Sequence, residues 1–233
     1  SNPTGAVYDK TLLQQVVDVA KEHGLVIFSD EIYDKILYDG HKHTCIASLT
    51  DEVFCVTLGG LSKNYRVAGF RAGWLVVSGN KRIAKDYIEG INMLASMRMC
   101  ANVPCQSAIQ TALGGYQSIN DLVHDGGRLK IQRDVAADML NSIPGIHCVK
   151  PKGAMYCFAR VDAKKFNISN DEQMIFDLLN EEKILLVHGR AFNLQEGCYF
   201  RLVFLPHADI LKPALTRIGS FFKHYRQHGP EVI

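Results

Sequence analysis

The stretch VFCVTLGGLSKNYRVAGFRAGWLVV, Val53–Val77, decides the fold class of this chain. It opens with the apolar, β-branched run VFCVTL and closes with a second apolar run, GWLVV. Short runs of this kind predict strands that are covered on both faces, as in an α/β sheet. Between the two runs lie Lys63 and Arg71, eight positions apart. The stretch therefore predicts two buried strands with two cations at the rim between them.

The segments before and after this stretch extend the pattern. Leu25–Phe28 is another short apolar run that predicts a strand, and Gly69–Val77 predicts the strand that contains GWLVV. Residues 9–23 carry apolar side chains at helical spacing, with Asp9 or Thr11 as candidate N-cap and Gly24 as the stop. Strands that alternate with helices indicate an α/β fold with a mostly parallel sheet. Further helices are expected over 80–115, with Pro104 beginning a second helix there, and over 127–142, 171–182 and 208–228.

The second half of the chain has a different character. Its apolar runs IHCVKP, AMYCFARV, KILLVHG and CYFRLVFL predict strands that are interleaved with two of the expected helices. This arrangement is typical of an α+β layer rather than of a parallel sheet. We therefore expect a boundary near residue 125, which divides residues 1–125 from a smaller α+β domain, 126–233.

The composition is that of a globular protein with no strong charge bias. Of the 233 residues, 47% are hydrophobic and 21% are charged, and the formal net charge is +2. Lys and Arg are spread along the chain, which argues against a nucleic-acid surface, and no apolar run reaches the length of a membrane span. The seven cysteines include no C-x-x-C pair, so we expect reduced, mostly buried thiols in a cytoplasmic protein.

Polar residues directly follow two of the predicted strands. Asp30 and Tyr33 come after the first run, and Ser62 and Lys63 come after VFCVTL. Ligands of open α/β sheets bind beyond the carboxyl ends of the strands. A lone lysine here would usually be solvated, and a lone aspartate would usually cap a helix. Together with Arg71 they match what pyridoxal phosphate requires: an amine that forms an imine, a carboxylate for the ring nitrogen, donors to the ring oxygen and a cation for the phosphate.

Five stretches carry a resemblance to a known family. NPTGAVY, DEIYDKILYDG, LSKNYRVAGFRAGW, KPKGAMYCF and FRLVFLP occur in this order and span nearly the whole chain. With them the sequence resembles the class I aminotransferases of fold type I, which use pyridoxal phosphate. GLSKNYRVAGFR, YIEGINMLASMRMCANVP and QTALGGYQSI resemble in particular the bacterial alanine (glutamate–pyruvate) aminotransferases. The resemblance implies a homodimer that transfers an amino group between alanine or glutamate and a 2-oxo acid by a ping-pong mechanism.

The resemblance also implies a role for individual residues at the cofactor ring. Lys63 would be the lysine that binds the cofactor covalently and later moves protons as general base and acid. Asp30 would pair with the ring nitrogen. Asn2 and Tyr33 would form hydrogen bonds to the ring oxygen.

The remaining roles concern the phosphate and the substrate. Arg71 would bind the phosphate, for which its planar guanidinium is suited. Arg201, in YFRLVF, would bind the substrate α-carboxylate. Many relatives carry a hydroxyl residue three positions before the lysine, where this chain has Gly60. We therefore expect Ser62 to take over a phosphate contact.

Two sequence motifs contain histidines that could bind a metal or a substrate, and for both an ordinary structural role is favoured. HKHTC, residues 41–45, has metal-like spacing, but no second cluster accompanies it, so an exposed loop is favoured over a metal site. His188 lies in a segment that approaches the active site in the resembling family, but packing or solvation is the favoured interpretation.

The first residues, SNPTG, open the chain within turn chemistry. The resembling family has a large segment ahead of NPTG, which supplies a phosphate-binding loop and the aromatic side chain that stacks on the cofactor ring. We therefore expect this chain to be a C-terminal part of a longer protein and to be inactive by itself.

Two other functions fit the same residues. A carbon–sulfur β-lyase of the same fold shares the lysine, the aspartate and the arginines, and would release pyruvate, ammonia and a thiol. A non-catalytic fragment or binding module is the other alternative, and it would not bind stoichiometric cofactor. The expected partners are amino acids and 2-oxo acids, with no nucleic acid and no membrane.

Overall fold

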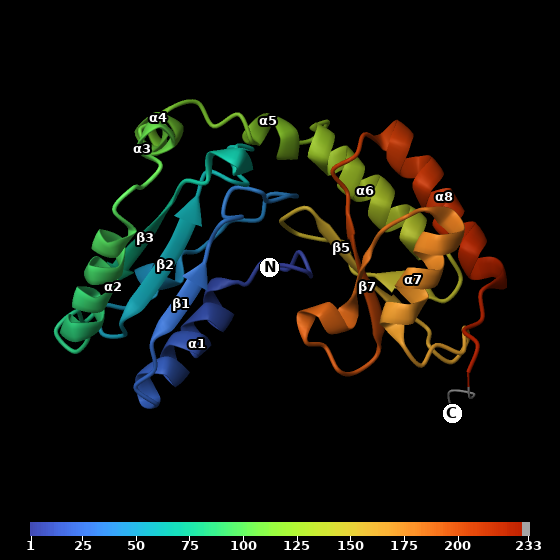
Figure 1. Cartoon of the computed structure of the whole chain (residues 1–233), viewed down its shortest axis with the longest axis horizontal. Coiled ribbons are helices and arrows are strands. Elements are labelled where there is room, and N and C mark those ends of the chain that lie inside the picture. The colour runs from blue at the N-terminus through green and yellow to red at the C-terminus, as the bar shows by residue number, and fades with distance from the viewer. Residues whose placement is uncertain (230–233) are drawn as a thin grey trace. The chain divides into compact units, whose positions relative to one another are not determined.

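The structure, a computed structural model, describes residues 1–229, and these form two compact units with a sheet each (Figure 1). Residues 7–37 and 42–120 form the lysine unit, named for Lys63. Residues 1–6, residues 38–41 and the described residues from 121 onward form the arginine unit, named for Arg201. The domain boundary that the change of sequence pattern predicts near residue 125 stays a prediction.

The sheet of the lysine unit has three strands in the order β1-β2-β3. β1 (Ile27–Asp30) pairs in parallel with β2 (Cys55–Gly60), and β2 pairs antiparallel with β3 (Gly73–Ser78). β1 is displaced from the predicted run Leu25–Phe28 because the Leu25 N–H bonds the carbonyl of Ala20 at the end of the preceding helix. Pairing with β2 therefore starts only at Ile27, and it continues through the polar end of the strand.

The first helix of the lysine unit, α1 (Lys10–Glu22), agrees with the predicted one. Its N-cap is Asp9, whose carboxylate accepts the Leu12 N–H at 2.8 Å, as the capping rule predicts. Val17 and Ala20 on this helix pack into a buried cluster with β1, β2 and the 3₁₀ helix η1 (Ile46–Leu49). This burial fixes α1 against the sheet and leaves the carboxyl ends of β1 and β2 free of it.

The segment predicted as helix over 80–115 is broken into three pieces. These are α2 (Lys85–Arg98), α3 (Val103–Gln106) and α4 (Ala108–Gly114). Met99 adopts a φ of 53°, which ends α2, and the expected proline stands in the first turn of α3. A short helix, α5 (Asn120–Val123), follows at the boundary with the arginine unit.

The sheet of the arginine unit has four strands in the order β4-β5-β7-β6, and all its pairs are antiparallel. They are β4 (Ile146–Cys148), β5 (Tyr156–Val161), β6 (Val187–His188) and β7 (Cys198–Val203). Ala159 lies opposite Phe200 in the register, and both are fully buried. Phe158 lies opposite Arg201. Because side chains alternate along a strand, these two pairs occupy opposite faces of the sheet.

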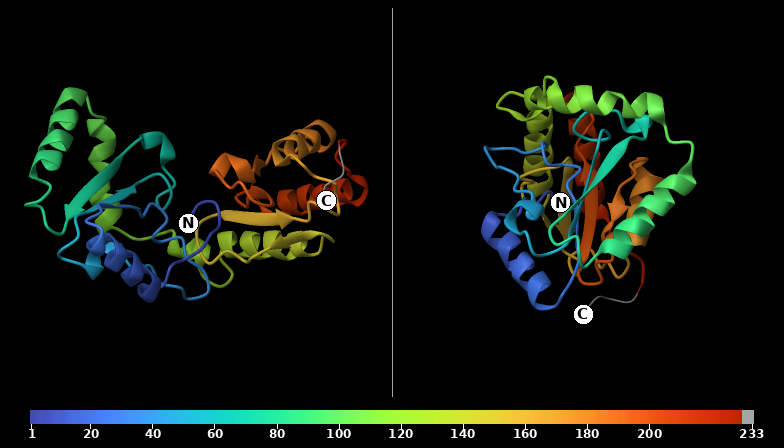
Figure 2. Two further views of the ribbon diagram at one scale, coloured as in Figure 1. Left: turned by 90° about the horizontal axis from the view of Figure 1, so that it is seen from below. Right: turned by 90° about the vertical axis from the view of Figure 1, so that its left-hand side faces the viewer.

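Three helices build the core of the arginine unit. α6 (Arg128–Asn141) runs alongside β5, and α7 (Asp171–Glu182) packs on β6 and β7 (Figure 2). α8 (Ala208–His224) packs on α6 and α7, and its Phe222 ring lies 6.4 Å from the Phe200 ring. α7 has the predicted bounds, whereas α8 ends at His224 rather than at residue 228. The helices therefore meet the face of β7 that carries Phe200, and the Arg201 face is the other one.

A buried arginine attaches residues 38–41 to the rest of the arginine unit. Arg133, 1% exposed, donates two hydrogen bonds to the Asp39 carboxylate at 2.6 and 2.9 Å, and a third to the Pro151 carbonyl at 2.9 Å. Its guanidinium also lies 4.7 Å from the centre of the Tyr38 ring. The hydrogen bonds from Arg133, together with the ammonium of Lys130, hold the pKa of Asp39 well below its usual range.

Several classes of site are not formed by the described residues. Within residues 1–229, no helix is long and apolar enough to cross a membrane. No group of three His, Cys, Asp or Glu in that range is arranged to hold a metal ion. All seven cysteines are free thiols.

Candidate active site

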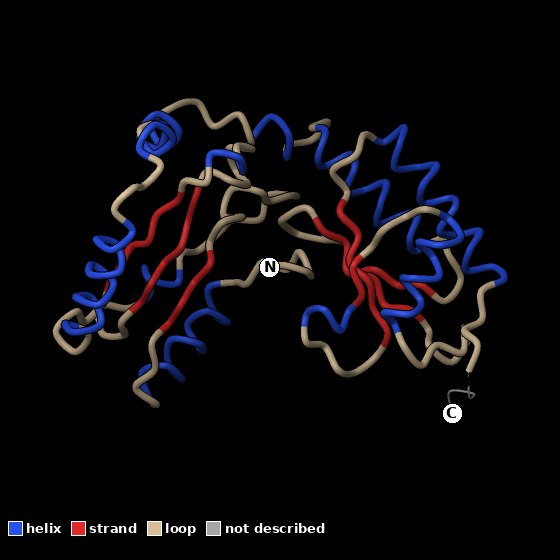
Figure 3. The backbone as a smooth tube through the Cα atoms, in the orientation of Figure 1, coloured by secondary structure: helices blue, strands red, loops and turns tan. Residues whose placement is uncertain are grey.

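Three of the predicted site residues lie at one edge of the lysine-unit sheet. Asp30 is the last residue of β1, and Lys63 follows the end of β2 by three positions. β1 and β2 are parallel, so their carboxyl ends meet at the same edge. The three strands of this sheet lie side by side (Figure 3). β3 is antiparallel, and its first residue pairs with the last residue of β2, which places Arg71 just before that same edge. The topology thus brings the Asp30 carboxylate to the same edge as the Lys63 amine and the Arg71 guanidinium, which follow it by more than thirty positions in the sequence.

The turn that carries Lys63 is anchored on both sides. Before it, Leu61 is 1% exposed, and its N–H bonds the carbonyl of Ala72 at 3.1 Å. After it, the buried Asn64 amide donates to the Asp34 carboxylate at 2.5 Å. Lys63 itself is half-buried, and within residues 1–229 its ammonium forms no hydrogen bond and no ion pair. The backbone is therefore held while the amine remains available for chemistry.

Asp30 and Tyr33 lie together in the turn that follows β1. The Asp30 carboxylate is exposed and accepts the Ile32 N–H at 3.2 Å, which orients it. Tyr33 is half-buried three positions further on. Asp30 thus presents a carboxylate at the sheet edge that needs no further structural partner to hold its orientation.

The residue after Asp30 is held by a histidine of the HKHTC loop. His43 Nε2 lies 2.8 Å from Glu31 Oε2, and the Ser29 hydroxyl donates to Oε1. Burial is the largest single influence on the pKa of Glu31 and acts to raise it. The hydrogen bonds from His43, Cys45 and Ser29, with the charge of His43, together outweigh burial, so the pKa is lowered. The hydrogen bond between His43 and Glu31 raises the pKa of His43. His43 therefore supports the end of β1, a role that sequence spacing did not reveal.

Ser62 and Arg71 are the predicted phosphate ligands of the lysine unit. Ser62 is half-buried, and Arg71 is exposed. Arg71 adopts a left-handed conformation with φ of 50°, and its Nη1 donates to the carbonyl of Ala68 at 2.9 Å. Left-handed backbone is uncommon for a residue with a side chain, and it recurs where a ligand-binding group must be aimed. The guanidinium keeps further N–H donors beyond the one that this carbonyl uses.

The other two predicted residues meet in the arginine unit. Arg201 Nη1 donates to the Asn2 side-chain oxygen at 2.8 Å, across 199 positions of the sequence. A guanidinium has no acceptor, so Asn2 must present its oxygen to Arg201 and keeps its NH₂ group to donate elsewhere. The Arg201 Nε–H is buried and, among the described residues, has no hydrogen-bond partner. An orphaned guanidinium donor of this kind is suited to a carboxylate ligand.

Aromatic rings enclose the Arg201 guanidinium. The centre of the Tyr156 ring lies 4.5 Å from it, and the centre of the Phe192 ring lies 4.9 Å away. Phe158, which is opposite Arg201 in the register, makes an edge contact with Phe192 at 5.8 Å. These contacts favour the cation and exclude water from it, so a carboxylate bound there is screened less. Nothing in the sequence indicated that Tyr156 or Phe192 contacts Arg201. Tyr156 lies in KPKGAMYCF, one of the stretches that carry the family resemblance, and Phe192 lies in none of them.

His188 occupies the face of the sheet opposite to Arg201. It is opposite Phe200 in the β6–β7 register, whereas Val187 is opposite Arg201. This placement agrees with the packing interpretation that its sequence context favoured.

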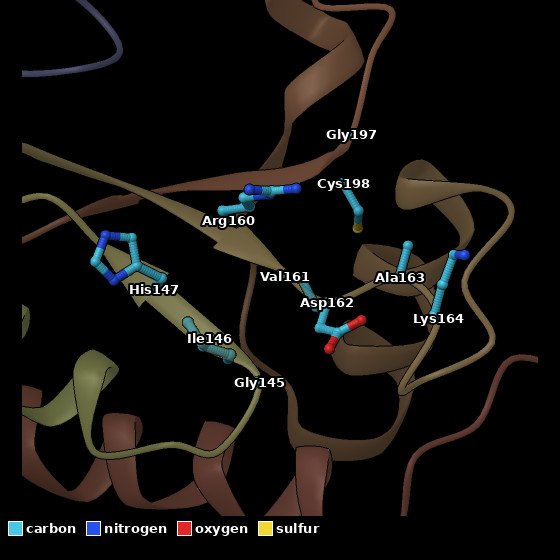
Figure 4. A pocket seen from close by; sticks show the side chains of 10 residues that line it. All are labelled: Gly145, Ile146, His147, Arg160, Val161, Asp162, Ala163, Lys164, Gly197 and Cys198. Atoms are coloured by element: carbon cyan, nitrogen blue, oxygen red, sulfur yellow. The ribbon is translucent and has the colours of Figure 1, made fainter.

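A cavity of about 600 Å³ lies elsewhere in the arginine unit (Figure 4). It is lined by residues 145–147, 160–164, 197 and 198. Basic side chains at its rim include Arg160 and Lys164. It contains none of the predicted site residues, and it is a different place from the Asn2–Arg201 pair.

Comparison with known proteins decides between the possible families. The family model described as "Aminotransferase class I and II" matches residues 1–218. The chain belongs to this family. The glutamate-pyruvate aminotransferase AlaA of Haemophilus influenzae is 59% identical over 227 residues, which are 97% of this chain and 56% of that protein. An alanine aminotransferase of Mycobacterium tuberculosis is 54% identical over 97% of this chain and 53% of that protein.

Solved structures agree with the sequence relatives. An aminotransferase from Escherichia coli matches with a TM-score of 0.96 and 55% identity, over 97% of this chain and 56% of that one. An alanine aminotransferase from Pyrococcus furiosus matches with a TM-score of 0.89 and 36% identity, over 96% of this chain and 56% of that one. The chain thus spans about half the length of the relatives it matches. The predicted family and the predicted α/β fold class are confirmed.

Proposed function

We propose that the chain contributes the catalytic lysine, the phosphate-binding arginine and the carboxylate-binding arginine of a transaminase that uses pyridoxal phosphate. Its reaction would exchange an amino group between alanine or glutamate and pyruvate or 2-oxoglutarate. The observation that carries the proposal is the half-buried, unpaired Lys63 amine at the same sheet edge as Asp30 and Arg71. The names of the relatives from Haemophilus influenzae and Mycobacterium tuberculosis, a glutamate-pyruvate aminotransferase and an alanine aminotransferase, support the choice of substrates.

The donor set of the lysine unit fits the cofactor in kind and in number. When bound, pyridoxal phosphate supplies an aldehyde that reacts with amines and a ring that takes up an electron pair. Asp30 would hold a proton on the ring nitrogen by accepting a hydrogen bond from it. Arg71 and Ser62 would bind the phosphate, and Tyr33 would donate to the ring oxygen. Lys63, which has no competing structural partner among the described residues, would be the amine that binds covalently.

Two residues of the arginine unit complete the proposed assignments. The Asn2 NH₂ group, left free by the bond of its oxygen to Arg201, would donate to the ring oxygen. Arg201, with its buried orphaned Nε–H, would bind the α-carboxylate of the amino acid. This bond would orient the substrate Cα–H toward a base, and orientation of this kind is a large part of catalysis.

The proton transfer falls to Lys63. With the cofactor and the substrate held in place, Lys63 Nζ would take the proton from the substrate Cα and return a proton as general acid. Asp30 would act through the ring, by stabilising the charge that develops as the Cα proton leaves. The homodimer and the cytoplasmic location expected from the sequence stay predictions.

Product analysis tests the proposal. The longer protein that the resemblance implies is saturated with pyridoxal phosphate and given alanine and 2-oxoglutarate, and pyruvate and glutamate are measured. This chain alone, assayed beside it, should form neither product. We expect the two products in equal amounts, without release of ammonia. Ammonia and a thiol released from a cysteine conjugate, without glutamate, would instead identify a β-lyase. Borohydride reduction followed by peptide mapping should place the pyridoxyl group on Lys63, and a different lysine would refute the assignment.

A further inference from the structure

Asp171, at the start of α7, is a buried carboxylate that the proposed reaction does not use. It is 3% exposed, and it follows the helix N-cap, Asn170. Asp171 Oδ2 accepts the backbone N–H of Arg190 at 3.1 Å. Oδ1 lies 3.5 Å from Arg190 Nε and 3.9 Å from His188 Nδ1, and it has no hydrogen-bond partner among the described residues. A buried charge is costly unless it is compensated, so this carboxylate requires an explanation.

His188 and Arg190, which lie next to the Asp171 carboxylate, belong to the end of β6 and to the segment that leads from it to β7. That segment follows His188 and forms the 3₁₀ helix η3 (Gly189–Phe192). The fit is close at Gly189, where an added Cβ would lie 3.2 Å from Asp171 Oδ2 and 2.9 Å from Tyr199 Cβ. The start of η3 is thus pinned between a carboxylate of α7 and a side chain of β7, and only glycine leaves room for it.

The other end of η3 reaches the proposed substrate arginine. Phe192 is its last residue, and the ring lies 4.9 Å from the Arg201 guanidinium. Asp171 and His188 lie on the face of the sheet that the helices cover. Phe192 and Arg201 lie on the opposite face of the same sheet. A fixed start and a length of four residues leave Phe192 little freedom to move away from the guanidinium.

We propose that Asp171 is a positioning residue for Arg201: by holding the Arg190 N–H and the start of η3, it keeps the Phe192 ring against the guanidinium. This inference rests on the proposed function, because it assumes that Arg201 binds the substrate carboxylate. Asp171 does not touch the substrate. It acts through η3, and its effect is on substrate affinity rather than on proton transfer.

The test measures affinity separately from turnover. The variants are made in the longer protein that the resemblance implies. That protein, loaded with pyridoxal phosphate, is titrated with glutarate, which has the carboxylates of glutamate without its amine, and binding is followed by the cofactor absorbance. Asp171→Ala should raise the glutarate Kd and the KM for alanine about fivefold, the order expected for loss of a cation–π contact. The kcat should stay within about twofold of wild type, since ground-state and transition-state binding are weakened equally.

Three further variants make the result decisive. Glu172→Gln removes a neighbouring carboxylate that is exposed on the same turn, and it should leave the Kd unchanged. Gly189→Ala should raise the Kd as Asp171→Ala does, because its Cβ would displace η3, and it provides the test if Asp171→Ala does not fold. Arg201→Lys should raise the Kd more than either.

The outcomes separate this inference from the proposed function. If Asp171→Ala and Gly189→Ala bind glutarate as wild type does while Arg201→Lys does not, the role of Asp171 is refuted and the proposed function stands. If Arg201→Lys also binds as wild type does, the assignment of Arg201 fails, and the proposed function with it. A fall in kcat at unchanged Kd would likewise overturn the positioning role of Asp171.

Discussion

Asp39→Asn should destabilise the chain, because it removes the charge that faces a buried arginine. Arg133 is 1% exposed, and it makes both of its shortest side-chain hydrogen bonds to this carboxylate, at 2.6 and 2.9 Å. Breaking a buried pair by removing one partner costs about 3–5 kcal/mol. The Asp39 side chain is 43% exposed, and Arg133 keeps the Pro151 carbonyl. Arg133 also keeps its ion pair with Asp134, whose Oδ1 lies 2.8 Å from Arg133 Nε. Solvent screening and this second carboxylate reduce the expected loss to about 2 kcal/mol.

The assay is urea unfolding followed by far-ultraviolet circular dichroism. Asp138→Asn is the matched control, because Asp138 is 72% exposed, and its ion pair with Lys150 spans 3.6 Å. An exposed pair of this kind contributes about 0.5 kcal/mol or less, so the control should unfold close to wild type. Equal free energies of unfolding for wild type and Asp39→Asn at neutral pH would refute the reasoning.

The pH dependence gives an independent check on the cause. The pKa of Asp39 is lowered in the folded state, chiefly by the hydrogen bonds from Arg133. Its stabilising contribution is therefore fully present above the unfolded pKa of about 3.9, and it is lost as the pH falls toward the folded pKa. The gap between wild type and Asp39→Asn should hold from neutral pH to about pH 5 and narrow below about pH 4. A gap that stays constant through this acidic range would show that the ion pair is not its source.

Three further substitutions should affect three different quantities: the turnover number, the affinity for the cofactor and the free energy of unfolding. Asp30→Asn should lower kcat about a hundredfold at unchanged fold, because an amide cannot hold the ring nitrogen protonated; near-normal turnover would give the carboxylate another role. Arg71→Lys should weaken binding of pyridoxal phosphate about tenfold in an absorbance titration, because an ammonium cannot form the two parallel bonds of a guanidinium, and unchanged affinity would remove Arg71 from the phosphate site. Phe200→Ala should cost about 3–5 kcal/mol in urea unfolding, because the ring is fully buried against Phe222, and a loss below about 1 kcal/mol would contradict the assignment of the core.

The bounds of helices were predicted best where the sequence contains a capping residue directly before the helix. α7 matches its predicted bounds because Asn170 caps it and Asp171 and Glu172 favour its first turn. α1 matches within a residue because Asp9 caps it. The broken helix over 80–115 was predicted less well, because nothing local marks the left-handed backbone of Met99 that ends α2.

Strand positions depended more on distant partners. Leu25 and Val26 looked like the start of β1, but the carbonyl of Ala20 captures the Leu25 N–H. The strand then extends to Asp30, because β2 offers partners as far as Leu58. Hydrophobic pattern alone could not place the strand, since its register is set by hydrogen bonds to a chain segment about thirty residues away.

The sequence by itself determined the family, the α/β class and the residue types of the candidate site, because these depend on motifs that can be read in order. Tertiary structure alone decided what surrounds Arg201 and what holds it. The bond to Asn2 joins residues 199 positions apart, and the contacts with Tyr156 and Phe192 come from two other segments. No local pattern encodes these contacts, because they join segments that are distant in the sequence and depend on the strand register that places Arg201 opposite Phe158.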